Sequence, residues 1–450
     1  MAGQSVKDMT VGSPAKLLLG FMVPLFFGNL FQQFYNMVDT IVVGRFLGVD
    51  ALAGVGSTGA VNFLVLGFCM GICAGFAVPV AQKFGEKDYE GMRRYVGNMI
   101  WLGAAFALVI TLVTTVLCRK ILVWMGNPAD TIEYAYNYIF YIFLGIPASM
   151  LYNLLSGIIR AMGDSRTPLY FLIFSSLLNI VLDIIFIVVF HWGVMGAGLA
   201  TVIAQLISGL LCLVLIAKKF PLLHITRDDI KPRKRYLLRL ASMGVPMGLQ
   251  YSVTAIGSVI LQTAVNGLGT VAMAAMTTGN KIGMFCSCAF DAIGTAAATF
   301  AGQNVGANRI DRVRQGVKVN AVYGSIYAVV IFGVLYFWGG NLARLFLDAE
   351  EMEVIALCQK MLVRVAAFYI PLMFVNLLRF TIQGMGYSEI AVVAGALEMV
   401  ARAGIGLGLV PFFGFDAVCF AGPLAWVLAD LFLFPCYFVC LKKVAKKKRL

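Results

Sequence analysis

Apolar runs long enough to cross a lipid bilayer follow one another along almost the whole chain. A helix that crosses roughly 30 Å of hydrocarbon needs about 20 apolar residues. Runs of that kind lie at 17–43, 51–80, 95–118, 132–159, 168–190, 194–217, 240–266, 271–302, 317–338, 354–383, 389–412 and 417–441. The chain is 60% hydrophobic and only 13% charged, which excludes an ordinary soluble domain. Because backbone groups in hydrocarbon must pair within their own segment, we predict an all-α polytopic membrane protein with twelve transmembrane helices.

The sequence also repeats itself at a spacing of about 221 residues. Residues 82–85 read Gln-Lys-Phe-Gly, and residues 303–306 read Gln-Asn-Val-Gly. A long-period repeat in so apolar a chain indicates two equivalent membrane lobes. We therefore expect two pseudo-symmetric six-helix lobes joined by a polar linker, with limits at 1–217, 218–239 and 240–450.

Lys and Arg residues gather on one side of the membrane when successive loops are assigned to alternate sides. That side holds the loops at 81–94, 218–239 and 303–318. It also holds both termini, of which the second is the Lys-rich tail after residue 441. The opposite side holds only Arg45, Arg119, Lys120 and Arg344. We predict a multi-pass protein of the cell inner (plasma) membrane with both termini in the cytoplasm.

The formal net charge of +13 is on this interpretation mainly a topology signal. Nucleic-acid binding is the rival interpretation of this charge, and it is disfavoured because the chain has no basic soluble domain. The linker at 218–239 is typical of a cytoplasmic, lipid-facing connector, and a regulatory or partner site is the alternative.

Two acidic residues inside apolar spans carry the functional argument. An ionisable side chain at membrane depth is costly and usually faces a cavity, an ion path or a partner. Asp39 lies in the first span and Asp183 in the fifth. Because two buried carboxylates need protons or cations to become neutral, we predict that they form the coupling site of a cation-driven carrier.

Further polar side chains share helical faces with these acids. Asn179 lies one helical turn before Asp183, and Thr201 and Gln205 repeat that spacing in the sixth span. In the first span the residues that share a face are Gln32, Tyr35, Asn36 and Asp39. Three helices of one lobe are thus expected to turn polar faces toward a common interior site. For Asn179, Thr201 and Gln205, hydrogen bonding between helices is the alternative interpretation.

The second lobe does not repeat this chemistry. Glu398 and Arg402 stand at the mirrored positions, four residues apart, where they can form an ion pair within one helix. Asp291 lies among small residues, and either faces the substrate cavity or pairs with Lys281. Asp430 lies near the middle of its span and has no recognised partner.

Two other residue types allow narrower predictions. Pro24 removes a backbone donor inside the first span, so we expect a hinge there, next to Asp39. Close cysteine pairs such as Cys69 and Cys73 sit inside apolar spans, and the chain has only two histidines. We therefore interpret the cysteines as packing residues and predict no metal site.

A family resemblance is carried by the segments 82–85 and 303–306 and by the run from Arg160 to Asp164 (Arg-Ala-Met-Gly-Asp). The chain resembles the multidrug and toxic compound extrusion (MATE) family. The resemblance covers nearly the whole chain. It implies that the polar cluster of the first lobe couples transport to a cation, as in the prokaryotic DinF-like branch, through Asp39, Asn179, Asp183 and Thr201. NorM-like members use acids in the seventh and tenth spans, and this chain has no acid in the core of either.

By the same resemblance we expect an antiporter that exports small amphipathic, often cationic compounds by alternating access, with H⁺ favoured over Na⁺. The substrate cavity is expected to include Gln32, Tyr35, Asn36, Asn153, Gln205 and Asp291, where Asn153 is assigned by the resemblance alone. A flippase for lipid-linked sugars is the alternative within the same superfamily.

An enzyme is disfavoured, because the chain lacks G-x4-G-K-[ST], G-x-S-x-G and H-E-x-x-H motifs. No cofactor is expected apart from H⁺ or Na⁺ as the coupling ion. The expected partners are the transported compounds and membrane lipid, and the chain is expected to be a monomer.

Overall fold

The computed structural model describes residues 6–125, 131–347 and 350–447, and these residues form helices without any strand. Within them, ten helices are long and apolar enough to cross a membrane. Two further pairs of bent helices each complete one span, which brings the number of spans to twelve. The predicted all-α fold with twelve membrane helices is confirmed. The last residues of the Lys-rich tail, 448–450, lie outside the described residues.

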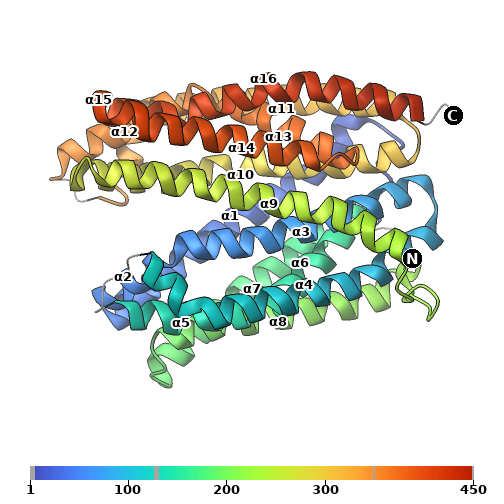
Figure 1. Cartoon of the computed structure of the whole chain (residues 1–450), viewed down its shortest axis with the longest axis horizontal. Helices are drawn as coiled ribbons and strands as arrows, with labels where there is room; N and C mark the ends of the chain where they lie inside the picture. Colours follow the sequence, from blue (N-terminus) through green and yellow to red (C-terminus); the bar gives the residue numbers. More distant parts are fainter. Residues whose placement is uncertain (1–5, 126–130, 348–349, 448–450) are drawn as a thin grey trace. The chain divides into compact units, whose positions relative to one another are not determined.

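The chain divides into two compact units (Figure 1). Unit 1 contains Met1–Asp8 and Phe27–Gly248, and unit 2 contains Met9–Phe26 and Leu249–Leu450. The helices α1 (Pro14–Leu47) and α9 (Lys234–Asn266) each contribute to both units. The other helices of unit 1 are α2 (Val49–Ser57), α3 (Gly59–Glu86), α4 (Tyr89–Trp124), α5 (Ile132–Leu144), α6 (Ile146–Ala161), α7 (Arg166–Ile184), η1 (Ile185–Val189), α8 (Val194–Lys219) and η2 (Pro221–Leu223). Those of unit 2 are α10 (Thr270–Gly306), α11 (Ile310–Ala343), α12 (Met352–Ala366), α13 (Tyr369–Gly384), α14 (Glu389–Gly404), η3 (Ile405–Leu409), α15 (Val410–Phe413) and α16 (Phe415–Lys447).

Each unit contains the first part of a helix whose second part belongs to the other unit. The first half of α1 belongs to unit 2, although the rest of that helix lies in unit 1. In the same way, the first half of α9, together with the linker before it, belongs to unit 1. The expected lobe limits at residues 217 and 240 assign each span to a lobe by its position in the sequence, whereas the units are defined by contacts. These lobe limits stay a prediction.

Both copies of the repeat bend at the same place, close to a proline. The helices α5 and α6 meet at an angle of 47°, and Pro147 lies at the start of α6. The helices α12 and α13 meet at 51°, and Pro371 lies in the first turn of α13. Proline is tolerated in a first turn, where its missing N–H has no intrahelical partner in any case.

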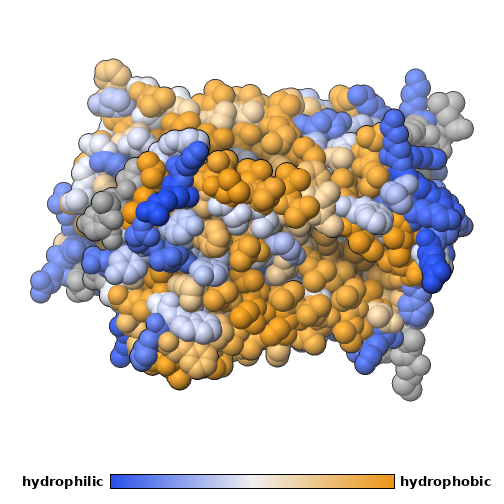
Figure 2. Space-filling model, turned by 60° about the horizontal axis from the view of Figure 1, so that its bottom comes forward, coloured by the Kyte–Doolittle hydropathy of each residue, from blue (hydrophilic) through white to orange (hydrophobic). Residues whose placement is uncertain are grey.

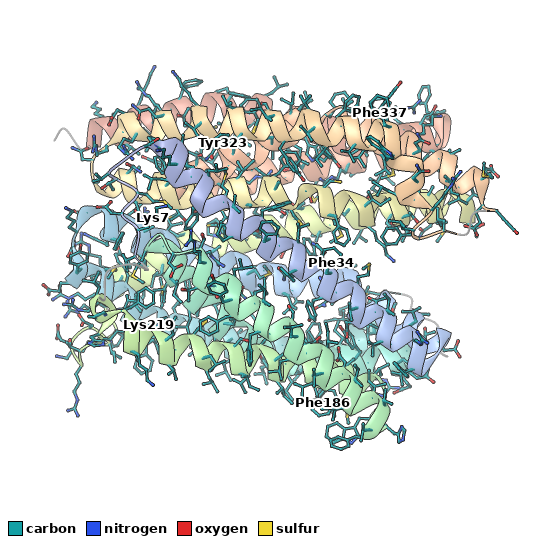
Figure 3. All side chains as sticks on the ribbon, turned by 180° about the vertical axis from the view of Figure 1, so that it is seen from behind. Lys7, Phe34, Phe186, Lys219, Tyr323 and Phe337 are labelled. Carbon is teal, nitrogen blue, oxygen red and sulfur yellow. The ribbon has the colours of Figure 1, made fainter. Side chains whose placement is uncertain are left out.

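A short π-helix interrupts the same helix in each copy. η1 begins at Ile185, directly after the turn that contains Asp183, and η3 begins at Ile405, shortly after Arg402. π-Helical turns are frequent at functional sites, because they displace side chains from regular α-helical positions. In unit 1, η1 with Phe186 and the end of α8 with Lys219 lie at opposite ends of the α7–α8 pair (Figure 3).

Glycines allow α3 and α9 to approach closely within unit 1. Gly71 and Gly75 of α3 face Gly244 and Gly248 of α9, and both pairs have the spacing Gly-x3-Gly. A Cβ atom at Gly71 would lie 2.5 Å from the Met247 backbone oxygen, and one at Gly75 would lie 2.5 Å from the Gly244 Cα. Small residues at this spacing are typical of tightly packed membrane helices.

The segment before α1 is bound by the second copy of the repeated motif, within unit 2. The Gln303 side-chain oxygen accepts from the Met9 N–H at 2.8 Å, and the Asn304 side chain donates to the Met9 carbonyl at 3.3 Å. Arg312 also donates to the Met9 carbonyl, at 3.0 Å, and to the Gly12 carbonyl at 2.9 Å. The polar residues of this motif therefore bind the main chain of an extended segment.

The linker before α9 is bound by α4 in a similar way, within unit 1. The Asn98 side chain accepts from the Arg233 N–H at 2.8 Å and donates to the Lys231 carbonyl at 3.3 Å. The Trp101 indole donates to the Ile230 carbonyl at 2.8 Å. Burial would raise the pKa of Asp229, but hydrogen bonds from Thr226 outweigh burial and lower this pKa below its usual value, with Arg93 also contributing.

The outward-facing side chains of the helices are apolar along their middle parts and hydrophilic toward their ends, as Figure 2 shows for one face. Exposed residues such as Leu108 and Val116 of α4 belong to this apolar surface. In a membrane protein such side chains contact lipid.

Candidate functional site

Asp39 of α1 and Asp183 of α7 lie together inside unit 1, as the sequence predicted. Their side chains are in hydrogen-bond contact, and they are 7% and 0% exposed respectively. A hydrogen bond between two carboxyl groups requires a proton on one of them, and two neighbouring carboxylates repel each other. A proton shared between the two carboxyl groups would relieve this repulsion.

Asn179 and Thr201 complete this cluster from α7 and α8. With its amide group turned to satisfy both of its atoms, Asn179 donates to Asp183 Oδ2 at 3.1 Å. The Asn179 oxygen then accepts from the Thr201 backbone N–H at 3.0 Å and lies 3.2 Å from the Thr201 hydroxyl. Asn179 thus links α7 to α8 and orients the Asp183 carboxyl group.

Two tyrosines contact the cluster, and only one of them was predicted. The Tyr35 hydroxyl forms a hydrogen bond with Thr201, one turn before Asp39 on α1. Tyr138 of α5 forms a hydrogen bond with Asp39 and is buried. No pattern in the sequence pointed to Tyr138, because a tyrosine within an aromatic-rich apolar span is ordinarily a packing residue.

The polar surface continues along α8 to a second group of side chains. Gln205 lies one turn after Thr201 and is hydrogen-bonded to Ser149 of α6. Asn153, one turn further along α6, donates to the Ser149 carbonyl at 2.8 Å. Gln205 and Asn153 are therefore brought together, and Ser149 between them is a residue that the sequence analysis missed.

The other predicted site residues are more scattered. Gln32 is partly exposed and Asn36 is exposed, both on α1. Asp291 of α10 is exposed in unit 2, and among the described residues no ion pair joins it to Lys281. Pro24 lies inside α1, which runs as one helix from Pro14 to Leu47.

In unit 2, the mirrored positions hold an ion-pair cluster. Arg402 of α14 donates to Glu398 Oε2 at 3.3 Å, which agrees with the ion pair expected from their spacing. Arg379 of α13 forms a second ion pair with Glu398, through Oε1, and the sequence analysis did not include it. An arginine inside the apolar run 354–383 was the signal that could have found it.

Among the described residues, no group of three or more His, Cys, Asp or Glu side chains is placed to hold a metal ion. The cluster of Asp39 and Asp183 offers carboxyl, amide and hydroxyl oxygens, which suit a proton or a hard cation rather than a transition metal.

The comparison with known proteins decides the family. The family model MatE matches the chain twice, at residues 24–185 and 246–407. The chain belongs to the MatE family. The double match also confirms the internal repeat seen in the sequence, and the membership identifies this MatE protein as a transporter and not an enzyme.

Relatives of this MatE protein agree with that assignment. "Probable multidrug resistance protein YoeA" of Bacillus subtilis (strain 168) is 31% identical over 343 residues, which cover 75% of this chain and 74% of the relative. "Multidrug export protein MepA" of Staphylococcus aureus (strain NCTC 8325 / PS 47) is 23% identical over 386 residues, 85% of each chain. A solved structure described as the outward-facing conformation of a multidrug resistance MATE family transporter has a TM-score of 0.91 at 21% identity. It covers 98% of this chain and 99% of its own. The two-lobe fold expected from the sequence is thereby confirmed.

Proposed function

We propose that this MatE protein is an antiporter that exports amphipathic, often cationic organic compounds in exchange for H⁺, with Na⁺ as the second candidate ion. The observation that carries the proposal is the contact between Asp39 and Asp183 in the interior of unit 1. The names of the relatives, which refer to multidrug resistance and export, support the substrate class.

The number of protons bound to Asp39 and Asp183 couples the export of substrate to the entry of protons. When both carboxyl groups are protonated the cluster is neutral, and when both have lost their protons it carries two negative charges. A cationic substrate is attracted by the deprotonated pair, and protonation removes that attraction. Because substrate and protons then favour different charge states of one site, each drives the release of the other.

Asn179, Thr201 and Tyr138 set the geometry of this exchange. Asn179 donates to Asp183, and Tyr138 is hydrogen-bonded to Asp39. Donors fixed in this way stabilise the ionised carboxylates, so that the protons can leave at membrane depth. Without them the burial of two acids would keep both permanently protonated.

The polar residues that continue from this cluster are the proposed substrate contacts. Gln205 and Asn153 lie around Ser149, and Gln32, Tyr35 and Asn36 lie on the same helix as Asp39. Asp291 is retained as a cavity residue of unit 2. Pro24 is proposed as a hinge of α1 during alternating access between an outward-open and an inward-open state. The protein acts in the plasma membrane with both termini in the cytoplasm, as a monomer.

Efflux from proteoliposomes with the proton and sodium gradients imposed separately tests this function. We expect a fluorescent organic cation to be exported when only a proton gradient is present, and not when only a sodium gradient is present. Asp39→Asn is expected to abolish proton-driven export, whereas Asp50→Asn, at an exposed acid of α2, is the matched control. Export that responds only to sodium contradicts the choice of ion, and full proton-driven export by Asp39→Asn contradicts the assigned site.

A further inference from the structure

Unit 2 contains a buried cluster of charged side chains that the proposed exchange at Asp39 and Asp183 does not use. Arg379 is 6% exposed and Glu398 is 3% exposed, and they form an ion pair between α13 and α14. Asp430 of α16 is 9% exposed. The helices α13, α14 and α16 pack against one another, so these side chains belong to one helix bundle (Figure 1).

Two atoms of this cluster are buried without a hydrogen-bond partner. They are Asp430 Oδ1 and Arg379 Nε. The two groups interact electrostatically, because the Arg379 charge acts on the Asp430 carboxyl group and the Asp430 charge acts on Arg379. An ionised carboxylate that is buried without partners costs several kcal/mol, so Asp430 has to be neutral or has to gain a cationic partner.

Glu398 is shared by two guanidinium groups, and this sharing makes a change of partner possible. Arg379 bonds one carboxylate oxygen of Glu398, and Arg402 bonds the other at 3.3 Å. If Arg379 leaves Glu398, the carboxylate remains paired with Arg402. Arg379 can therefore turn to an ionised Asp430 without leaving a buried charge uncompensated.

The ionisable groups that act on Arg379, the neighbour of Asp430, come from several helices. Arg379 itself lies on α13, whereas α14 supplies Glu398 and Arg402, α10 supplies Asp291, and α9 supplies Tyr251. Arg379 and Arg402 carry two positive charges, and Glu398 balances one of them. The Arg379–Glu398–Arg402 group thus has one positive charge in excess, and of the two carboxyl groups that act on Arg379, Asp291 is exposed and Asp430 is buried.

We propose that Asp430 is a proton-binding carboxyl group of unit 2, and that Arg379 changes partner from Glu398 to Asp430 when Asp430 loses its proton. In the protonated state Asp430 is neutral and Arg379 is paired with Glu398, as the structure has it. When the carboxyl O–H bond breaks, the proton passes to water and the carboxylate accepts Arg379. The chain thus holds a second proton site, separate from the pair of acids in unit 1.

Infrared difference spectroscopy tests the proton site without relying on transport. The purified chain with Asp39→Asn and Asp183→Asn has lost the acid pair of unit 1, so this background isolates unit 2. We expect a carboxyl C=O band that disappears as the pH rises, and we expect Asp430→Asn to remove it. Asp416→Asn is the matched control, because Asp416 lies on the same helix and pairs with Lys360 at 2.5 Å and with Arg364 at 2.8 Å near the helix start.

The change of partner is tested by Glu398→Gln in the same background. This variant leaves Arg379 with Asp430 as its remaining carboxylate partner, so the protonated Asp430 band is expected to weaken at any given pH. Thermal unfolding of each variant shows that it is folded. A band that persists in Asp430→Asn, or one that is removed by Asp291→Asn instead, overturns the assignment of the proton. A band unchanged by Glu398→Gln overturns the exchange of partners.

Transport separates this inference from the proposed function. In the otherwise unmodified chain, Asp430→Asn is expected to lower the number of protons exchanged per substrate by about one while export continues. If the unit 1 variants still export with full proton coupling, the proposed function is wrong, but the infrared result for Asp430 stands unaffected.

Discussion

Asn179 donates a hydrogen bond to Asp183 Oδ2 at 3.1 Å, and both residues lie on α7 one turn apart. Asn179 is also bonded to Thr201 of α8, so a single amide group ties an ionisable side chain to a neighbouring helix. Any movement of α8 relative to α7 therefore changes the hydrogen bond that Asn179 donates to the Asp183 carboxyl group. A coupling site needs such a connection between a proton and a helix position.

Asn179→Ala is expected to weaken proton-driven export while leaving Asp183 in place. Loss of the donor leaves a buried carboxylate oxygen unsatisfied, at a cost of about 1–3 kcal/mol, which corresponds to roughly a 5- to 150-fold loss in the exchange rate. The measurement is efflux against external pH, with Ser176→Ala of the same helix as control. Export with an unchanged pH profile contradicts the orienting role of Asn179.

Asp183→Asn is expected to abolish the dependence of export on the proton gradient. The substituted amide cannot carry the proton, yet it keeps the size and hydrogen-bonding capacity of the side chain. Binding of a fluorescent cation to the purified protein is expected to become independent of pH over the range in which the unmodified chain responds. A pH-dependent affinity that survives in this variant means that protons are exchanged elsewhere.

Tyr138→Phe tests the residue that the sequence did not reveal. The change removes only the hydroxyl group that bonds Asp39 and keeps the buried ring. We expect slower proton-driven export at unchanged thermal stability, because the ionised Asp39 loses a donor. Tyr141→Phe, on the same helix, is the control and is expected to behave as the unmodified chain. Equal export by both variants excludes a role for the Tyr138 hydroxyl.

Gly75→Ala is expected to destabilise the protein by about 1–3 kcal/mol or more, as overpacking does. The added Cβ would lie 2.5 Å from the Gly244 Cα, which is backbone and cannot turn aside. Gly333→Ala in α11 is the matched control, since a Cβ there meets nothing within 4 Å. Helix propensity makes that control stabilising by up to about 1 kcal/mol. Thermal unfolding in detergent measures both, and equal melting temperatures contradict the tight α3–α9 contact.

The linker is expected to loosen in acid because of Asp229. Its pKa is lower in the folded chain than the usual value of about 3.9. The stabilisation is therefore complete above that usual value, and it is lost as the pH falls below it through the folded pKa. Hydrogen-exchange protection of residues 226–233, corrected for the intrinsic effect of pH, measures this change. In Asp229→Asn the protection should be low throughout, and protection equal to that of the unmodified chain excludes the contact.

The sequence predicted the membrane spans, the repeat and the central acids, because each leaves a strong local signal. Long apolar runs require helices, and Asp39 and Asp183 are conspicuous within them. The helical spacing of Asn179 with Asp183, and of Thr201 with Gln205, placed each pair on a common face. These predictions needed only the geometry of single helices.

The contacts that the sequence did not predict depend on which helices pack together. Patterns within a single helix do not contain that information. Tyr138 and Ser149 resemble packing residues until α5 and α6 are placed beside α1 and α8. Arg379 pairs with Glu398 across two helices, whereas spacing along one helix suggested only Arg402. The sequence also did not predict that α1 and α9 each contribute to both units. Counting spans along the chain assigns each whole helix to a single lobe.

The sharing of α1 and α9 between the units also fixes the order of events during synthesis. The stretch Met9–Phe26 leaves the ribosome early, yet Gln303, Asn304 and Arg312, which bind its beginning, are translated only in the second half of the chain. Unit 1 likewise cannot close until the first half of α9 has been made. Neither half of the repeat can thus complete its unit alone, and the beginning of α1 waits for its partners in unit 2 until translation is well advanced.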